Sequence, residues 1–299
     1  MKKSNAEIPQ IGFAQSQING FEIMPLELLF KRMKNVKDHD PYAPHRVNFF
    51  MIMIISSGQG SHFIDFKNYR FKEKSILFIA KDQVHSFSQE ENAKGFLIIF
   101  TEQFLNENLV VSRHLSESYI YNYLNRNPVI TNSEERFFIL ADLMNQEYTF
   151  PDKSNSAEAI RYLLHLFLLK AESITREKFQ GSIHPNHLIL FDRFNDFLLT
   201  NYSQTRNVKD YAEHLNISYQ HLNSVCKEIR GITAKEYVDE FITLEIKRYL
   251  AGTNLSNKEI CYRVGFDEPT NLSKFFKKNS GFTLNEFKNI YSYQPDSAD

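Results

Sequence analysis

Residues 259–281, EICYRVGFDEPTNLSKFFKKNSG, decide the fold of the C-terminal half of this chain. Apolar residues recur at helical spacing on both sides of Gly265, and glycine suits a tight turn between two helices. The pattern predicts a first helix over Glu259–Val264 and a second helix with Asp267 as its N-cap and Pro269 in its first turn. The buried face of the second helix would consist of Leu272, Phe275 and Phe276.

The opposite face of this second helix is polar and basic. It carries Thr270, Asn271, Lys274, Lys277 and Lys278. Between Thr270 and Lys288 there are four lysines and a single acid, Glu286. Lysines of this kind often form no more than a solvated face. Beside a complete helix-turn-helix pattern, however, they indicate contact with the phosphates of nucleic acid.

The same pattern occurs about fifty residues earlier, in Val208–Lys227. Asn216 lies where the turn requires a residue that tolerates the left-handed region, and Ser218 is a good N-cap for the following helix. The face of that helix pointing away from its apolar side carries Gln220, Asn223, Ser224 and Lys227. Amide and hydroxyl side chains read base edges and a cation binds phosphate, so this face is a second candidate DNA reader.

Helix start signals continue through residues 187–291. Three segments fit the S/T-x-x-E capping box, beginning at Thr233, Ser256 and Thr283. With the two patterns above, the predicted helices are 187–201, 207–214, 218–228, 233–251, 256–263, 268–278 and 283–291.

The N-terminal half has the short period of β structure instead. Strands are predicted at Arg46–Ser56, Ser61–Phe66, Ile76–Ala80, Val84–Ser88 and Phe96–Phe100. In the second of these strands, His62, Ile64 and Phe66 lie on one face. Short strands at regular spacing favour an antiparallel barrel or sandwich. Helices are expected near 133–148 and 157–179. The second has a wide apolar stripe (Ile160, Leu163, Leu164, Phe167, Leu168 and Ala171), which suits either packing on the sheet or contact with a second subunit. Glycine and proline place a linker at 181–187.

Composition narrows the classes of function. The 299 residues contain 35 Lys+Arg and 36 Asp+Glu, a net charge of −1, so any contact with DNA must come from local placement of charge. The basic start MKKSNAEIPQ is followed by no apolar stretch, so we expect no secretory signal, and the longest apolar runs are too short to span a membrane. Cys226 and Cys261 are expected to be reduced and buried in a cytoplasmic protein. No motif for a catalytic nucleophile, a phosphate loop or a metal site is present, so we expect no enzyme, cofactor or metal.

Three segments resemble the DNA-binding domain of AraC/XylS transcription regulators. They are YAEHLNISYQHLNSVCKE, GITAKEYVDEFITLEIKRYL and SNKEICYRVGFDEPTNLSKFFKKNSGFTLNEFK. The resemblance implies two helix-turn-helix subdomains joined by a long helix, here 233–251, over a domain at 188–292. It implies that Gln220, Asn223 and Ser224, then Thr270, Asn271 and Lys274, face the bases. Double-stranded DNA and RNA polymerase are the partners it implies, as for the activators of this family.

Residues 40–100 resemble, more weakly, the cupin-like sensor domain of such regulators. The matching features are Pro44-His45-Arg46, Gly58-x-Gly60-x-His62 and Asp82-Gln83-Val84-His85-Ser86-Phe87. The fold class implied is α+β, with residues 1–180 forming a barrel at about 40–105 followed by helices at 133–179 that make a homodimer. His45, His62 and His85 are candidates for an effector pocket, for a metal site or for purely structural roles. The alternative function is a cupin-type binding protein or enzyme with a helical appendage.

Overall fold

The computed structural model describes residues 10–12, 16–34, 40–88, 93–107, 120–121, 127–149, 155–180 and 183–291. The chain divides into two compact units, one ending at Arg176 and the other beginning at Glu177. This division lies within helix α4, Ser156–Gln180. Of the expected linker 181–187, Gly181 and Ser182 lie outside the described residues, and helix α5 already begins at Pro185.

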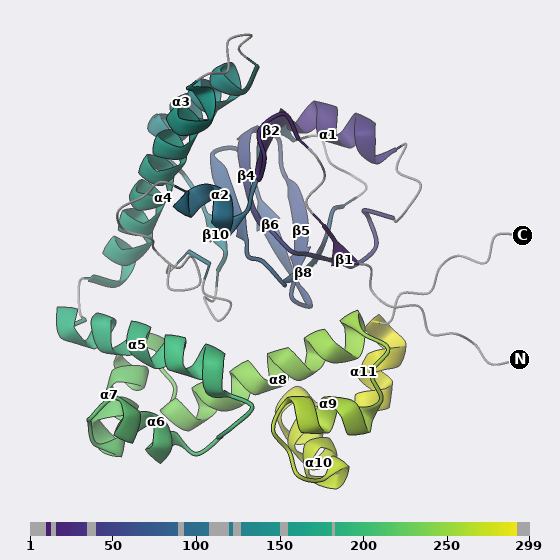
Figure 1. Cartoon of the computed structure of the whole chain (residues 1–299), viewed down its shortest axis with the longest axis vertical. Coiled ribbons are helices and arrows are strands. Elements are labelled where there is room, and N and C mark those ends of the chain that lie inside the picture. The colour runs from purple at the N-terminus through teal and green to yellow at the C-terminus, as the bar shows by residue number, and fades with distance from the viewer. Residues whose placement is uncertain are drawn as a thin grey trace, which may run out of the picture. The chain divides into compact units, whose positions relative to one another are not determined.

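Two five-stranded sheets form the N-terminal unit (Figure 1). The first has the order β1-β3-β8-β5-β6 and the second β10-β7-β4-β9-β2. Their bounds are β1 Gln10–Ile11, β2 Phe21–Pro25, β3 His45–Val47, β4 Phe50–Ser57, β5 Gly60–Ile64, β6 Lys67–Phe71, β7 Ser75–Ile79, β8 Val84–Ser86, β9 Lys94–Phe100 and β10 Val129–Ile130. The helices of this unit are α1 Leu26–Met33, α2 Glu102–Asn106, α3 Glu135–Thr149 and α4. The predicted α+β class and antiparallel β domain are confirmed.

Strand β4 is apolar along its whole buried length because both of its faces are covered. Phe50, Ile52 and Ile54 point into the core shared with α3 and α4. Met51 and Met53 point to the other side, into the core between the two sheets. Because successive side chains of a strand lie on opposite faces, a strand covered on both faces must be apolar throughout.

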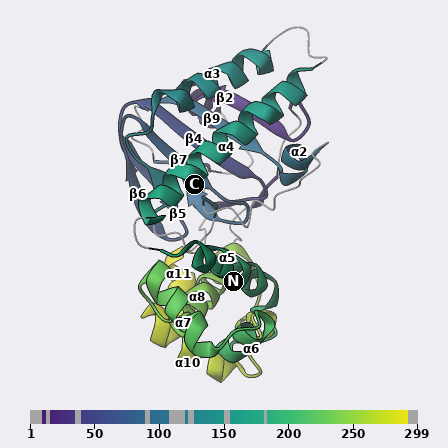
Figure 2. The same ribbon diagram turned by 90° about the vertical axis from the view of Figure 1, so that its left-hand side faces the viewer.

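The predicted apolar stripe of α4 packs inside the unit. Ile160, Leu164, Phe167 and Ala171 are fully buried in the core that also holds Ile98 of β9. Figure 2 shows α3 and α4 lying across β2, β9, β4 and β7. The opposite faces of these two helices leave large apolar side chains exposed, namely Ile139, Leu143, Tyr162, Leu166 and Leu169.

Three details of the strand predictions were wrong. The run Arg46–Ser56 is two strands in different sheets, since β3 pairs with β8 whereas β4 pairs with β7 and β9. Phe66 is in a turn and not on the strand face of His62, because Asp65 and Phe66 both have positive φ in the hairpin between β5 and β6. Strands β1, β2, β6 and β10 were not predicted. Strand β6 lies at the edge of the first sheet, and its exposed polar residues carry no apolar alternation.

The C-terminal unit is helical and contains every helix predicted for it. The bounds are α5 Pro185–Asn201, α6 Val208–His214, α7 Tyr219–Arg230, α8 Ala234–Gly252, α9 Asn257–Arg263, α10 Pro269–Ser280 and α11 Leu284–Tyr291. Helix α8 contacts α6 and α7 towards one of its ends and α9, α10 and α11 towards the other (Figure 1). Its buried residues include Tyr237, Val238 and Ile242, so it is the shared core element of two subdomains.

All three predicted capping boxes form. At Thr233 and Ser256 the hydroxyl accepts the N–H three residues later, and the glutamate there accepts the N–H of the cap. The Thr283–Glu286 pair makes the same two hydrogen bonds, at 3.2 and 2.7 Å. These bonds satisfy backbone donors that a helix start would otherwise leave open. None of the helices that the structure describes is long and apolar enough to cross a membrane.

Candidate nucleic-acid interface

The first helix-turn-helix consists of α6, the turn at residues 215–218 and α7. Asn216 has φ +56°, as predicted for the left-handed position of the turn. Ile217 N–H donates to the Ala212 carbonyl at 3.0 Å, which closes the turn against α6. Ser218 Oγ accepts the His221 N–H at 3.1 Å and thereby caps α7. The predicted cap residues therefore fix the direction in which α7 leaves the turn.

The outer face of α7 is polar and accessible. Gln220, Ser224 and Lys227 are exposed, whereas Leu222, Val225 and Cys226 on the inner face are fully buried. Asn223 is only half-buried, and its Oδ1 accepts the Ala234 N–H of α8 at 3.0 Å. Its side chain thus already holds α7 to the start of α8, and this role was not predicted from the sequence.

The second helix-turn-helix consists of α9, the turn at Gly265-Phe266 and α10. Gly265 has φ +80°, and the buried thiol of Cys261 donates to the Phe266 carbonyl at 3.2 Å. The N-cap of α10 is Glu268 and not the predicted Asp267, because Pro269 occupies the first helical position. Because the ring of Pro269 fixes its φ at a helical value, α10 begins there without a side-chain cap.

The outer face of α10 matches the predicted reading face in exposure. Thr270, Asn271, Lys274, Lys277 and Lys278 are all exposed, and Leu272 and Phe276 of the inner face are fully buried. The Lys277 charge helps to lower the pKa of Glu286, although the hydrogen bonds from Thr283 to that carboxylate contribute more. Burial raises the pKa of the Cys226 thiol to about 12 and also raises that of Cys261, so both cysteines are neutral packing residues.

The three candidate histidines of the barrel lie together. His62 Nε2 is 3.1 Å from His85 Nδ1, and the rings of His45 and His85 have centroids 4.2 Å apart. All three are buried, and burial, with a smaller contribution from the His45 charge, lowers the pKa of His62 to about 3. His62 is therefore neutral at physiological pH, and within the described residues its Nδ1 has no hydrogen-bond partner. No group of His, Cys, Asp or Glu in the described ranges has the arrangement of a metal site.

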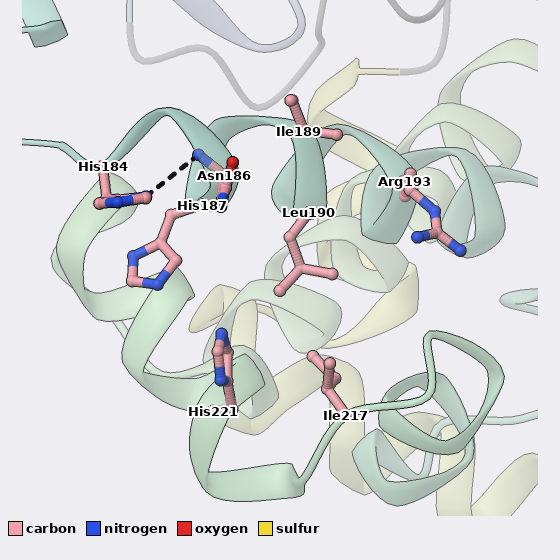
Figure 3. A pocket seen from close by; sticks show the side chains of 8 residues that line it. All are labelled: His184, Asn186, His187, Ile189, Leu190, Arg193, Ile217 and His221. Atoms are coloured by element: carbon pink, nitrogen blue, oxygen red, sulfur yellow. Dashed lines mark hydrogen bonds between the residues drawn. The ribbon is translucent and has the colours of Figure 1, made fainter.

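A second histidine cluster, beside α7, was not predicted. A cavity of about 460 Å³ is lined by His184, His187, Arg193 and His221 together with Ile189, Leu190 and Ile217 (Figure 3). His187 pairs with Glu228 of α7, and the His184 N–H donates to the same carboxylate at 3.1 Å, which lowers the pKa of Glu228. These contacts fasten the start of α5 to the recognition helix. Glu228 lies about forty residues from His184 and His187 in the sequence, so no local sequence pattern predicts these contacts.

Comparison with known proteins agrees with this architecture. Residues 36–164 match the family described as AraC-like ligand binding domain, and residues 211–290 match a helix-turn-helix domain family. One curated relative is the HTH-type transcriptional activator RhaS of Escherichia coli O139:H28, 20% identical over 252 residues, covering 83% of this chain and 87% of RhaS.

Solved structures with detectable similarity include ToxT from Vibrio cholerae and the C-terminal domain of AraT, a response regulator from Geobacillus stearothermophilus. ToxT is 14% identical with a TM-score of 0.44 and covers 92% of this chain and all of ToxT. The AraT domain is 25% identical with a TM-score of 0.34 and covers 37% of this chain and 91% of that domain.

A ligand-binding β domain followed by a double helix-turn-helix defines a class of transcription regulators. The chain belongs to the AraC/XylS family of these regulators. The family, the cupin-like domain and the DNA-binding function predicted from the sequence are confirmed. Membership also favours a regulator over the alternative of a cupin-type enzyme.

Proposed function

We propose that this regulator reads DNA with the outer faces of α7 and α10. Gln220 and Ser224 contact bases from α7, and Thr270, Asn271 and Lys274 do so from α10. Lys227, Lys277 and Lys278 bind phosphates and set the register of the protein on the duplex. The observation that carries this proposal is that both faces are polar and exposed on helices whose opposite sides are fully buried.

Asn223 takes a mixed role in this proposal. Its Oδ1 is engaged by α8, so its Nδ2 group is the part that remains to donate to a base or phosphate. It therefore contributes to DNA recognition mainly by fixing the angle of α7. Glu268, exposed at the start of α10, disfavours close approach of phosphate there and helps to restrict where the duplex lies.

The N-terminal unit is proposed to bind a small-molecule effector, with His45, His62 and His85 in its recognition site. The convergence of three buried imidazoles supports this role. Because His62 is neutral, it would supply hydrogen bonds and not positive charge, which favours a polar uncharged group at this point of the ligand.

We also propose that the regulator acts as a homodimer through the outer faces of α3 and α4. Five large apolar side chains are exposed there, in contrast to the buried stripe on the inner face of α4. Several exposed large apolar side chains on two adjacent helices are typical of an interaction surface. In this proposal the dimer works in the cytoplasm as an activator that contacts RNA polymerase. The name of the relative RhaS, a transcriptional activator, supports the activator part of this proposal.

The test of the DNA proposal is in vitro selection of bound duplexes by the full chain, followed by titration of the selected site with salt. We expect a motif of two boxes whose centres are about one helical turn, or 34–36 Å, apart. A plot of log affinity against log salt should fall with a slope of about −0.9 for each phosphate neutralised. Enrichment of a single box, or no enrichment, would contradict the proposal.

A further inference from the structure

The segment between α5 and α6 belongs firmly to the first helix-turn-helix subdomain. Tyr211 Oη donates to the Thr205 carbonyl at 2.8 Å, and Asn207 N–H donates to Thr205 Oγ1 at 3.1 Å. The Gln204 N–H donates to the Asn201 carbonyl at the end of α5 at 2.9 Å. Residues 203–206 are thus held in place by both neighbouring helices.

The same segment lies directly against the turn of the second helix-turn-helix. A Cβ atom at Gly265 would lie 2.1 Å from the Ser203 carbonyl oxygen. The Arg206 guanidinium lies over the ring of Phe266, 3.6 Å from the ring centroid. Phe266 is buried and packs edge-on against Phe275 of α10 at 5.1 Å. The contact therefore runs from the first subdomain to the second recognition helix.

The backbone of the turn does not by itself require glycine. In the first unit the equivalent left-handed position is filled by Asn216, at φ +56°. At Gly265 the φ of +80° is accompanied by a backbone oxygen that excludes any side chain. Glycine is needed at this position because the two subdomains approach each other there.

We propose that Gly265 and Arg206 are positioning residues that set the distance and the rotation between the two DNA-reading helices. This inference rests on the proposed function of α7 and α10. Helix α8 links the subdomains, and the contact between residues 203–206 and the second turn adds a separate constraint beside it. Together they hold α7 and α10 in one relative orientation.

The consequence is selectivity for the spacing of the two DNA boxes. One inserted base pair moves the second box by about 3.4 Å and rotates it by about 35°. A rigid pair of readers must then lose contacts at one box. A pair that is joined only by α8 tolerates the insertion better, at the expense of affinity for the correct spacing.

The experiment uses the full chain and three duplexes made from its selected site: the original, one with a base pair inserted between the boxes, and one with the second box scrambled. Binding is measured by fluorescence anisotropy. Gly265→Ala is expected to lower the preference for the original over the inserted duplex by about 2- to 150-fold, the range that interaction energies between neighbouring groups span. Affinity for the duplex with only the first box should not change.

A matched control separates the contact from backbone strain. Gly281 has φ +81°, and a Cβ there would meet no atom within 4 Å. Gly281→Ala therefore introduces the same left-handed alanine without a collision, and the spacing preference should stay as in the wild type. Arg206→Gln removes the stacking on Phe266 and leaves the turn intact, so it tests the same contact if Gly265→Ala does not fold. A reduced preference for the original over the inserted duplex is again expected.

Two outcomes would overturn the inference in different ways. If the wild type distinguishes the two spacings and both Gly265→Ala and Arg206→Gln distinguish them equally well, the positioning role is wrong and the proposed function stands. If the wild type binds the original and scrambled duplexes alike, the two-reader function fails, and this inference fails with it.

Discussion

Replacement of Asn223 by alanine tests how the first recognition helix is held. The Asn223 Oδ1 atom accepts the N–H of Ala234, which is the first residue of α8 and is fully buried. The Thr233–Glu236 capping box satisfies the N–H groups of Thr233 and Glu236, whereas the Ala234 N–H donates to Asn223. Asn223→Ala therefore leaves a buried donor without a partner, at a cost of about 1–2 kcal/mol.

The loss is measurable in two ways on the full chain. For a helical unit of this size, that loss corresponds to a fall in the Tm of roughly 4–9 °C, measured by calorimetry. Hydrogen exchange should report the Ala234 amide directly, with faster exchange in the variant. Ser224→Ala is the control, because Ser224 is exposed on the same helix and its loss should change stability by less than about 0.5 kcal/mol.

DNA binding adds a second readout. Asn223→Asp keeps an acceptor for the Ala234 N–H, so the Tm should be nearly restored. The new negative charge on the reading face should still weaken DNA binding. If Asn223→Ala leaves both the Tm and the exchange of the Ala234 amide unchanged, the assigned hydrogen bond does not stabilise the junction of α7 and α8.

Four further predictions concern DNA contact, acid stability and assembly. Lys274→Ala should weaken binding to the selected site by about 1–3 kcal/mol and relax preference in the second box, whereas Lys258→Ala on α9 should not; an equal loss on every sequence would make Lys274 a phosphate contact only. Because the pKa of His62 is lowered to about 3, the unfolded chain takes up its proton first, so the β unit should lose stability as the pH falls below about 6.5, and NMR should show no titration of His62 between pH 5 and 8. Hydrogen bonds from Thr233 lower the pKa of Glu236, so its contribution to helix stability is present above about pH 4.5 and is lost as the pH falls through the lowered value; Glu236→Gln should flatten that part of an acid-unfolding curve. Leu166→Glu, on the exposed face of α4, should give a monomer in sedimentation velocity with an unchanged circular dichroism spectrum, and a sedimentation mass equal to that of the wild type would remove α4 from the dimer interface.

The helical half was predictable because its signals are local. The cap residues Ser218, Thr233 and Ser256 lie within three residues of the groups they bind. The left-handed turn position is likewise predicted from the residue that occupies it, Asn216. Side-chain periodicity then separates the buried face of each helix from the exposed one. The candidate reading faces follow from these two kinds of pattern.

What escaped prediction depends on contacts between distant residues. The division between β3 and β4 depends on the strands with which each one pairs. A uniformly apolar stretch of sequence gives no information about those pairing partners. Asn223 reaches Ala234, and Glu228 reaches His187, across spacings that no helical period marks. The site was therefore predicted as a set of faces, and the bonds that orient those faces came from the structure.

The most direct measurement of the central claim is a chemical footprint of the full chain on its selected duplex, read at each guanine N7 in the major groove. Two protected groups about 10 base pairs apart are expected, with protection of one lost in Gln220→Ala and of the other in Asn271→Ala. A single protected group, or two that respond identically to both variants, would contradict the assignment of α7 and α10 as separate readers.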